Sequence, residues 1–297
     1  MRRRLRSHLT YANRTVTRTG PRRTATALVT FLAALALWAA PASAVQPPKV
    51  MAALGDSITR AFNTDGSCSL FRDCPENSFS TGTNPAVNSQ FQRIKAIDPE
   101  RNPVAYNDAV SGARASGLDD QAKKAASQDA DYVTIEIGAN DACRSDPNAQ
   151  MTPTETFRSQ VKTALDDLVA ADPKVYIEML SIPDINRLHT IFTDPVNQAA
   201  LDRWSALHVC QNLLVNPTST AEADKDRRDA FRAQVMAYNG ALADVCAAIK
   251  RCLYDKDAVF KRQFTTADVS TADYFHPSLE GQTHLAEVSW KATFSME

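Results

Sequence analysis

The stretch VMAALGDSITRAFN, residues 50–63, decides the fold. Its first five residues, Val50–Leu54, form an apolar run with the length of a buried strand, and Gly55 can end that strand. We expect a helix to begin in the next segment, Ile58–Phe62. Ser57 then stands alone at a strand-to-helix turn, where its hydroxyl and backbone N–H both point away from the core. The rest of the chain must explain this serine.

Strands and helices alternate after this turn, separated first by a loop-rich stretch at residues 64–84. Hydrophobic runs predict further strands, at residues 103–110, 132–137, 174–182 and about 252–260. Helical periodicity predicts helices, at residues 87–97, 118–127, 154–171, 227–250 and about 278–294. Residues 184–225 mix apolar side chains with polar loops and fit neither pattern. This alternation favours an α/β fold with a mainly parallel sheet of roughly five strands, covered on both faces.

The first 44 residues have the order of a secretory signal. They carry eight Arg and no acidic residue, then an apolar run at residues 25–40, then Ala42-Ser43-Ala44 as an A-x-A cleavage site. We expect cleavage after Ala44, with an uncleaved anchor as the alternative. Arg22-Arg23 leaves twin-arginine export open beside the general route. Residues 45–297 then form one secreted domain.

The predicted mature chain is acidic. Without the leader it holds 25 basic and 34 acidic residues, a formal charge of −9. This balance argues against nucleic acid as a partner and against electrostatic docking to anionic lipid. No second apolar run is long enough to span a bilayer, so we expect the mature protein to be soluble. We also expect a monomer, although charge and composition do not bear on the oligomeric state.

All six cysteines lie in the predicted mature chain, at positions 68, 74, 143, 210, 246 and 252. An even number in an exported chain favours disulfides, and the lack of a C-x-x-C pair argues against a zinc ribbon or a thioredoxin-type site. Fifteen pairings are formally possible. Pairing the near neighbours, Cys68–Cys74 and Cys246–Cys252, leaves Cys143–Cys210 as a long-range bridge, which is the pairing we predict.

Polar groups follow three of the predicted strands, and the carboxyl ends of parallel strands are where α/β sheets bind ligands. Ser57 follows the first strand, Ser111-Gly112 the second, and Asn140 the third. A serine that attacks an ester passes through an oxyanion, which fixed hydrogen-bond donors must stabilise. The N–H groups of Ser57 and Gly112 and the Asn140 amide can supply three such donors, and Gly112 has no Cβ to hinder approach. Three unrelated turns remain the structural alternative.

A serine nucleophile also needs a base. Outside the leader the histidines are His189, His208, His276 and His284, and only the sequence around His276 suits this role. Asp273 precedes His276 by three residues, and Pro277 disfavours helical geometry there. Asp273 can then accept the imidazole Nδ1–H, which leaves Nε2 to take the serine proton. A helix N-terminus with an incidental Asp and His is the alternative.

Four segments in this order resemble the conserved blocks of the SGNH, or GDSL, hydrolases: GDSIT at 55–59, SGA at 111–113, GAND at 138–141 and DYFHP at 273–277. The resemblance implies a flavodoxin-like three-layer α/β/α sandwich, and it is greatest to the secreted lipase and phospholipase-B-like branch. No G-x-S-x-G elbow of the ordinary α/β-hydrolases occurs. The roles that the resemblance implies are nucleophile for Ser57, orienting acid for Asp273, base for His276, and an oxyanion hole of Ser57, Gly112 and Asn140.

These features predict a secreted serine esterase or lipase that cleaves small-molecule or lipid esters without a metal or other cofactor. A carbohydrate esterase that removes acetyl groups from polysaccharide uses the same residues, and an exported binding protein without chemistry is a third possibility. For Asp56 we expect a turn-capping role and not a catalytic one. If Cys143 pairs with Cys210, the apolar segment around Trp204 and Leu207 either forms a wall for an acyl chain or packs a helix onto the sheet.

Overall fold

The computed structural model describes residues 47–64 and 68–293. The predicted export signal, residues 1–44, lies outside this part of the chain. The first strand, β1 (Val50–Gly55), is buried along almost its whole length, as expected for a central strand whose apolar run is covered on both faces. Among the described residues, no helix combines the length and the hydrophobicity needed to span a bilayer.

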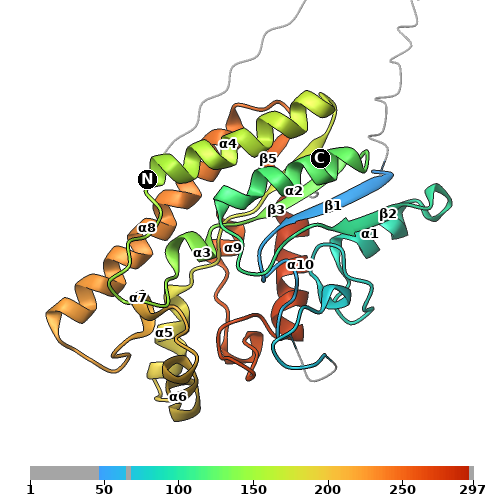
Figure 1. Cartoon of the computed structure of the whole chain (residues 1–297). Coiled ribbons are helices and arrows are strands. Elements are labelled where there is room, and N and C mark those ends of the chain that lie inside the picture. Colours follow the sequence, from blue (N-terminus) through green and yellow to red (C-terminus); the bar gives the residue numbers. More distant parts are fainter. Residues whose placement is uncertain (1–46, 65–67, 294–297) are drawn as a thin grey trace, which may run out of the picture. The chain divides into compact units, whose positions relative to one another are not determined.

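Five parallel strands form one sheet in the order β2-β1-β3-β4-β5 (Figure 1). The strands after β1 are β2 (Val104–Asn107), β3 (Tyr132–Glu136), β4 (Tyr176–Met179) and β5 (Cys252–Tyr254). Since all five strands run the same way, their carboxyl ends meet at one edge of the sheet. The predicted parallel α/β fold with roughly five strands is confirmed.

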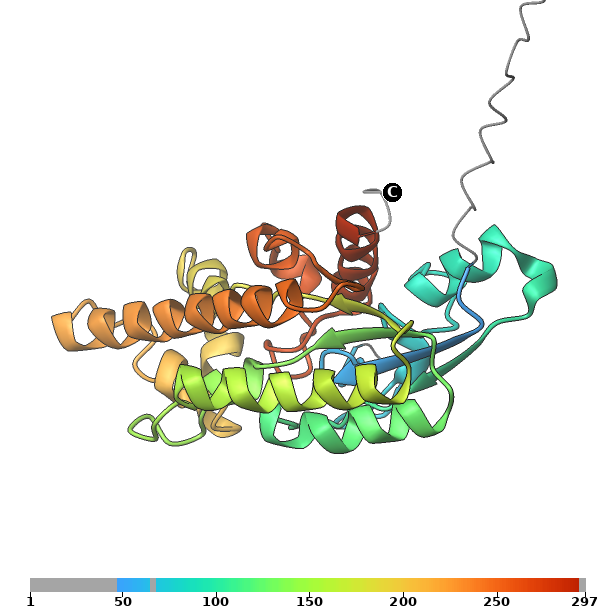
Figure 2. The same cartoon turned by 90° about the horizontal axis from the view of Figure 1, so that it is seen from above.

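Helices cover both faces of this sheet (Figure 2). On one face α2 (Leu118–Ser127) packs against α4 (Thr154–Ala171), and α4 packs against α8 (Glu222–Ala247). On the other face, Met51 and Tyr132 of the sheet pack with Ile94 of α1 (Gln90–Ile97) and Trp290 of α10 (Leu279–Thr293). The molecule is therefore the three-layer sandwich that the family resemblance implied.

The remaining elements are short. Five of them are helices, namely α3 (Ala139–Ala142), α5 (Asn186–Thr193), α6 (Gln198–Ala206), α7 (Gln211–Leu214) and α9 (Ala258–Lys261). Single 3-10 turns lie at Pro75–Asn77, Pro99–Arg101, Ala115–Gly117 and Thr266–Asp268. Helices α5 to α7 occupy the segment that the sequence pattern left unplaced.

Several predicted boundaries differ from the structure by one to three residues, and three elements differ by more. Residues 58–62 form turns and no helix. Arg60 N–H donates to the carbonyl of Asp56, four residues back, whereas Phe62 N–H donates to the carbonyl of Ser57, five residues back, so the hydrogen bonds do not repeat as in an α-helix. The last strand ends at Tyr254, since the carboxylate of Asp255 accepts the N–H groups of Asp257 and Val259 and starts a turn. Helix α8 begins at Glu222, five residues before the predicted start at 227.

Candidate active site

Ser57 lies at a tight turn that directly follows β1. Gly55 has a φ of +145°, and a Cβ there would collide with the backbone carbonyl of Glu136 on the adjacent strand, so this position requires glycine. Asp56 Oδ1 accepts the backbone N–H of Ile58 at 2.9 Å, which caps the turn. The Ser57 side chain thereby leaves the strand at the carboxyl edge of the sheet, where it lines a cleft.

A second tight turn, at residues 270–277, carries Asp273 and His276. Ser270 N–H donates to the carbonyl of His276 at 2.9 Å, and Tyr274 N–H donates to the carbonyl of Ser270 at 2.8 Å. Tyr274 has a left-handed φ of +54°, and this turns the chain so that Asp273 and His276 face each other. From the far side, Trp204 Nε1 donates to the carbonyl of Tyr274 at 2.9 Å.

The two turns meet in a chain of hydrogen bonds. His276 Nε2 lies 2.8 Å from Ser57 Oγ, and His276 Nδ1 lies 2.7 Å from Asp273 Oδ2. The imidazole ring is flanked by Phe62, with ring centroids 5.0 Å apart, and by Phe275, with centroids 5.2 Å apart and planes at 80°. The structure thus brings together the three residues of the predicted triad, in the order serine, histidine, aspartate.

The carboxylate of Asp273 has four donors. Oδ1 accepts the backbone N–H groups of Phe275 and His276 at 2.9 and 3.0 Å, and Oδ2 accepts His276 Nδ1 and, at 2.6 Å, Asn63 Nδ2. Burial raises the pKa of Asp273, but the charge of His276 and the hydrogen bonds from His276 and Asn63 outweigh burial, and the pKa lies below its ordinary value. The group is therefore ionised when it faces His276. Sequence reasoning missed Asn63.

Gly112 and Asn140 line the same cleft as Ser57 and His276, which has a volume of about 270 Å³. Gly112 has a φ of +83°, and a Cβ there would meet no atom of the protein, so the backbone conformation requires glycine and the space beside it stays open. Asn140 Nδ2 donates to the carbonyl of Ala113 at 3.0 Å and, at 3.3 Å, to Asp56 Oδ2. The longer of these bonds is the weaker one.

Two further carboxyls lie buried beneath the cleft. Burial raises the pKa of Asp56 to about 7, although the Ile58 N–H, the charge of His276 and the Asn140 amide each lower it. Glu136 is buried at the end of β3, and no protein group among the described residues bonds either of its carboxyl oxygens. Burial, together with the charge of Asp56, raises the pKa of Glu136 well above its ordinary value. Both effects favour the uncharged form of the Glu136 carboxyl.

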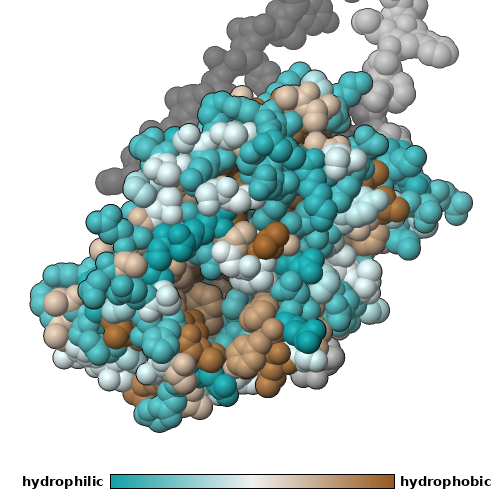
Figure 3. Space-filling model, in the orientation of Figure 1, coloured by the Kyte–Doolittle hydropathy of each residue, from teal (hydrophilic) through white to brown (hydrophobic). Residues whose placement is uncertain are grey.

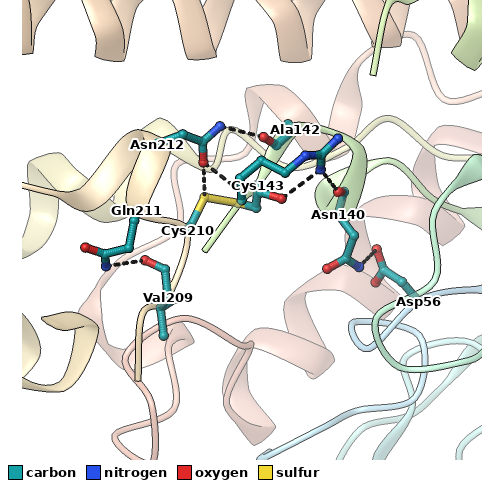
Figure 4. The surroundings of a disulfide bond; sticks show 9 residues. Asp56, Asn140, Ala142, Cys143, Val209, Cys210, Gln211 and Asn212 are labelled. Atoms are coloured by element: carbon teal, nitrogen blue, oxygen red, sulfur yellow. Dashed lines mark hydrogen bonds between the residues drawn. A yellow bond between two sulfur atoms is a disulfide. The ribbon is translucent and has the colours of Figure 1, made fainter. Parts of the chain in front are cut away.

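A disulfide and an amide hold the segment that carries Asn140 (Figure 4). Cys143 is bonded to Cys210, with Cα atoms 4.6 Å apart. Asn212 of α7 donates to the carbonyl of Ala142 at 2.7 Å and accepts the N–H of Arg144 at 2.8 Å. Closing a loop of this length stabilises a fold by about 4 kcal/mol in the chain-entropy model. The structure also joins the two short predicted pairs, Cys68–Cys74 and Cys246–Cys252.

Trp204 does not form the wall for an acyl chain that its position near Cys210 suggested. The side chain is fully buried, lines neither the cleft nor the neighbouring pocket, and stacks edge-on with Phe192 at 5.8 Å. Its indole N–H supports the turn that carries the triad histidine. Packing was therefore the correct alternative for Trp204, whereas Val209 and Cys210 of the same segment do line the cleft.

Two groups among the described residues have a geometry that could hold a metal ion, namely Cys68, Cys74 and Glu76, and Asp268, Glu280 and His284. The two cysteines of the first group are bonded to each other. In the second group, His284 Nδ1 already pairs with Asp268. None of the six residues lines the cleft beside Ser57. A metal ion bound by either group would therefore lie outside that cleft.

The family model described as GDSL-like Lipase/Acylhydrolase matches residues 53–284, and these include the end of β1, all of β2 to β5 and every candidate site residue. The chain belongs to this family. The predicted family and enzyme class, SGNH or GDSL carboxylic-ester hydrolases, are thereby confirmed. The two turns around Ser57 and His276 are the local structures that its motifs encode.

Similar proteins include one characterised by sequence and two by structure. A stretch of 177 residues, 50% of this chain, is 31% identical to the membrane-associated phospholipase B1 of Rattus norvegicus and covers 12% of that protein. LAE5, an α/β hydrolase from the metagenome of Lake Arreo in Spain, aligns with a TM-score of 0.51 and 21% identity over 84% of this chain and 96% of its own. A variant of Axe2, an acetyl xylan esterase from Geobacillus stearothermophilus, aligns with a TM-score of 0.51 and 18% identity over 82% and 94%. At such identities, these structures support the fold alone.

Proposed function

We propose that this GDSL hydrolase cleaves carboxylic acyl esters with Ser57 as nucleophile, His276 as base and Asp273 as orienting acid. The observation that carries the proposal is the unbroken series of hydrogen bonds, at 2.8 and 2.7 Å, from Ser57 through His276 to Asp273. These are the distances at which a base can take a proton from a nucleophile. This geometry and the family together support hydrolysis of carboxylic esters, the activity of an esterase or a lipase.

In the first step His276 Nε2 takes the proton of Ser57 Oγ as the oxygen attacks the ester carbonyl. The ionised Asp273 stabilises the imidazolium that forms and keeps Nδ1 protonated. Negative charge develops on the carbonyl oxygen, and the N–H groups of Ser57 and Gly112 and the Asn140 amide are its donors. His276 then returns the proton to the leaving alcohol, and the acyl group stays on Ser57.

In the second step, a water molecule loses a proton to His276 and attacks the acyl-enzyme. The same three donors stabilise the second oxyanion, and the carboxylic acid leaves as Ser57 Oγ recovers its proton from His276. The chain needs no metal for either step, because its own donors supply the charge stabilisation. We therefore expect full activity in the presence of EDTA, and inhibition that zinc or calcium reverses would contradict this mechanism.

Two substrate classes fit this chemistry. The similarity to phospholipase B1 favours lipid esters. The identity of this chain to phospholipase B1, 31%, is higher than its identity to the Axe2 variant, 18%. An acetylated carbohydrate is the alternative, since Axe2 acts on acetyl xylan and has the same fold. A series of chromogenic esters from acetate to dodecanoate separates them, because activity confined to acetate favours the carbohydrate.

We also propose that residues 45–297 act as one exported domain after removal of the leader. The three disulfides support an oxidising compartment, since cytosolic thiols are kept reduced. Mass determination of the N-terminus of protein recovered from the medium of the native host tests the cleavage site. A protein retained in the cell with residues 1–44 attached would contradict export by cleavage.

Ser57→Ala is the decisive test of the mechanism. The substitution removes the nucleophile and adds no bulk, so we expect a loss in kcat on the order of 10⁴-fold or more with unchanged stability. Ser111→Ala is the matched control, because Ser111 lines the same cleft and has no role in the proton transfers. Turnover of Ser57→Ala within tenfold of the wild type would refute the serine mechanism.

A further inference from the structure

A second cavity lies directly behind the candidate catalytic residues. Its walls include the immediate neighbours of three of them, because Ile58 follows Ser57, Ala139 precedes Asn140, and Phe275 and Pro277 flank His276. Its volume is about 60 Å³, several times the roughly 10–15 Å³ that a single water needs. On the face drawn in Figure 3, apolar residues gather beside a hollow in the lower part of the molecule, where Figure 1 places α5.

The lining of this cavity is mostly apolar, and its few charged side chains bond to other protein groups. Three polar residues contribute to it, and each is engaged by another group. The Arg187 guanidinium donates to Gln263 Oε1 at 2.8 Å and to the carbonyl of Phe264. Asp184 pairs with Arg232 at 2.8 Å, and Asp268 pairs with His284. What remains facing the cavity is mostly aliphatic and aromatic surface, which favours the apolar part of a ligand.

Phe275 separates this cavity from the cleft around Ser57, since it lines both. Its ring stands edge-on to the His276 imidazole and is only partly buried. The two cavities differ in chemistry: the cleft is lined by Ser111, Arg144 and Ser145 beside the candidate triad, whereas α5 contributes Leu188 and Ile191 to the apolar side. An ester held at Ser57 therefore has a polar compartment on one side and an apolar one on the other.

We propose that the apolar cavity binds the acyl chain of the substrate, that Phe275 forms the wall over which the chain passes, and that the cleft holds the alcohol part. This inference rests on the proposed function and narrows its substrate class to esters of aliphatic acids longer than acetic acid. On attack by Ser57 Oγ, the bond from the acyl carbon to the alcohol oxygen breaks. The alcohol then leaves through the cleft with the proton from His276, while the acyl chain stays in the cavity.

The test compares p-nitrophenyl hexanoate with p-nitrophenyl acetate, because their leaving group is the same. Each fully buried methylene contributes about a fourfold gain, so four methylenes can raise kcat/KM for hexanoate over acetate by up to about 250-fold. Leu188→Trp places a larger ring in the cavity from a half-buried position on α5. We expect it to abolish most of the preference for hexanoate over acetate.

Ile191→Trp fills the cavity from a second position and protects the test against a misfolded first variant. Val196→Trp is the control, since Val196 is exposed and lines neither cavity, and it should keep the wild-type ratio. An unchanged ratio in both filling variants, with folding verified by thermal melting, overturns the inference, as does a wild type active on acetate alone. Ser57→Ala separates the two hypotheses: an active Ser57→Ala enzyme refutes the mechanism, whereas an inactive one with unchanged ratios in the tryptophan variants refutes only the acyl site.

Discussion

Replacing Asn63 with glycine tests how the carboxylate of Asp273 is held. The buried Asn63 side chain donates from Nδ2 to Asp273 Oδ2 at 2.6 Å, and its Oδ1 accepts the backbone N–H of Phe71 at 2.6 Å. Asn63 has a left-handed φ of +56°, which glycine adopts without strain. Asn63→Gly therefore removes both hydrogen bonds and does not force the backbone to move. Asn63 is a positioning residue in this reasoning, because it acts only through Asp273.

A hydrogen bond to a charged group contributes about 1.5–3 kcal/mol, and every 1.4 kcal/mol of lost transition-state stabilisation slows a reaction about tenfold. Asp273 keeps three of its four donors in the variant, so the lower figure applies and kcat should fall about tenfold with little change in KM. Asn63 also helps to lower the pKa of Asp273. Without it that pKa rises, and the acid limb of the kcat–pH profile should move to higher pH.

Asn216→Gly is the matched control. Asn216 also has a left-handed φ, of +49°, and its Nδ2 donates to an aspartate, Asp224, at 3.4 Å, but it lines neither cavity. The assay is the kcat–pH profile with p-nitrophenyl hexanoate, with urea denaturation of both variants alongside. If Asn63→Gly keeps the wild-type profile, or if Asn216→Gly shifts it equally, then Asn63 does not position Asp273.

Three other substitutions have definite expected outcomes. Asn140→Ala should lower kcat by about 10²–10³-fold in steady-state assays, whereas a raised KM with unchanged kcat would make Asn140 a ground-state binding residue. Glu136→Leu should stabilise the fold by about 1–3 kcal/mol in urea denaturation at pH 8, because it removes a buried carboxyl without a protein partner. Since the folded-state pKa of Glu136 is raised above 4.5, this gain should shrink as the pH falls toward about 4.5 and stay constant below it, and a loss of stability at pH 8 would contradict the prediction. Trp204→Phe removes the indole N–H that supports the carbonyl of Tyr274, so kcat should fall several-fold while the ratio of hexanoate to acetate turnover stays constant; a changed ratio would restore Trp204 as a substrate wall.

The sheet could be predicted because its signals are local. A run such as residues 50–54 is apolar throughout only if both faces of the strand are buried, and the helices between the strands show ordinary periodicity. Residues 184–225 could not be placed, because helices α5, α6 and α7 are short. Their apolar residues contact loops and one another across the end of the sheet, so no regular spacing appears in the sequence.

The residues of the candidate site divide in the same way. Ser57, Asn140 and the pair Asp273 and His276 stand in short motifs at strand ends or before a helix, and the structure brings them to one cleft. Asn63 and Trp204 stand in no motif. Each acts through one contact with a residue far along the chain, at separations of 210 and 70 residues, and a single sequence contains no signal for such a contact.

The proposed nucleophile and base lie 219 residues apart in the chain, and this separation determines when during synthesis the enzyme could first act. Ser57 is made early, with the first strand, whereas His276 precedes the last helix. That helix must also be in place, because Gln282 of α10 donates to the carbonyl of Ile58 at 2.8 Å and accepts the N–H of Phe79 at 2.8 Å. A chain synthesised only as far as β5 therefore lacks the proposed base and cannot attack the esters of the cell that makes it. Turnover of an ester would accordingly report that the chain has been made and folded at least as far as α10.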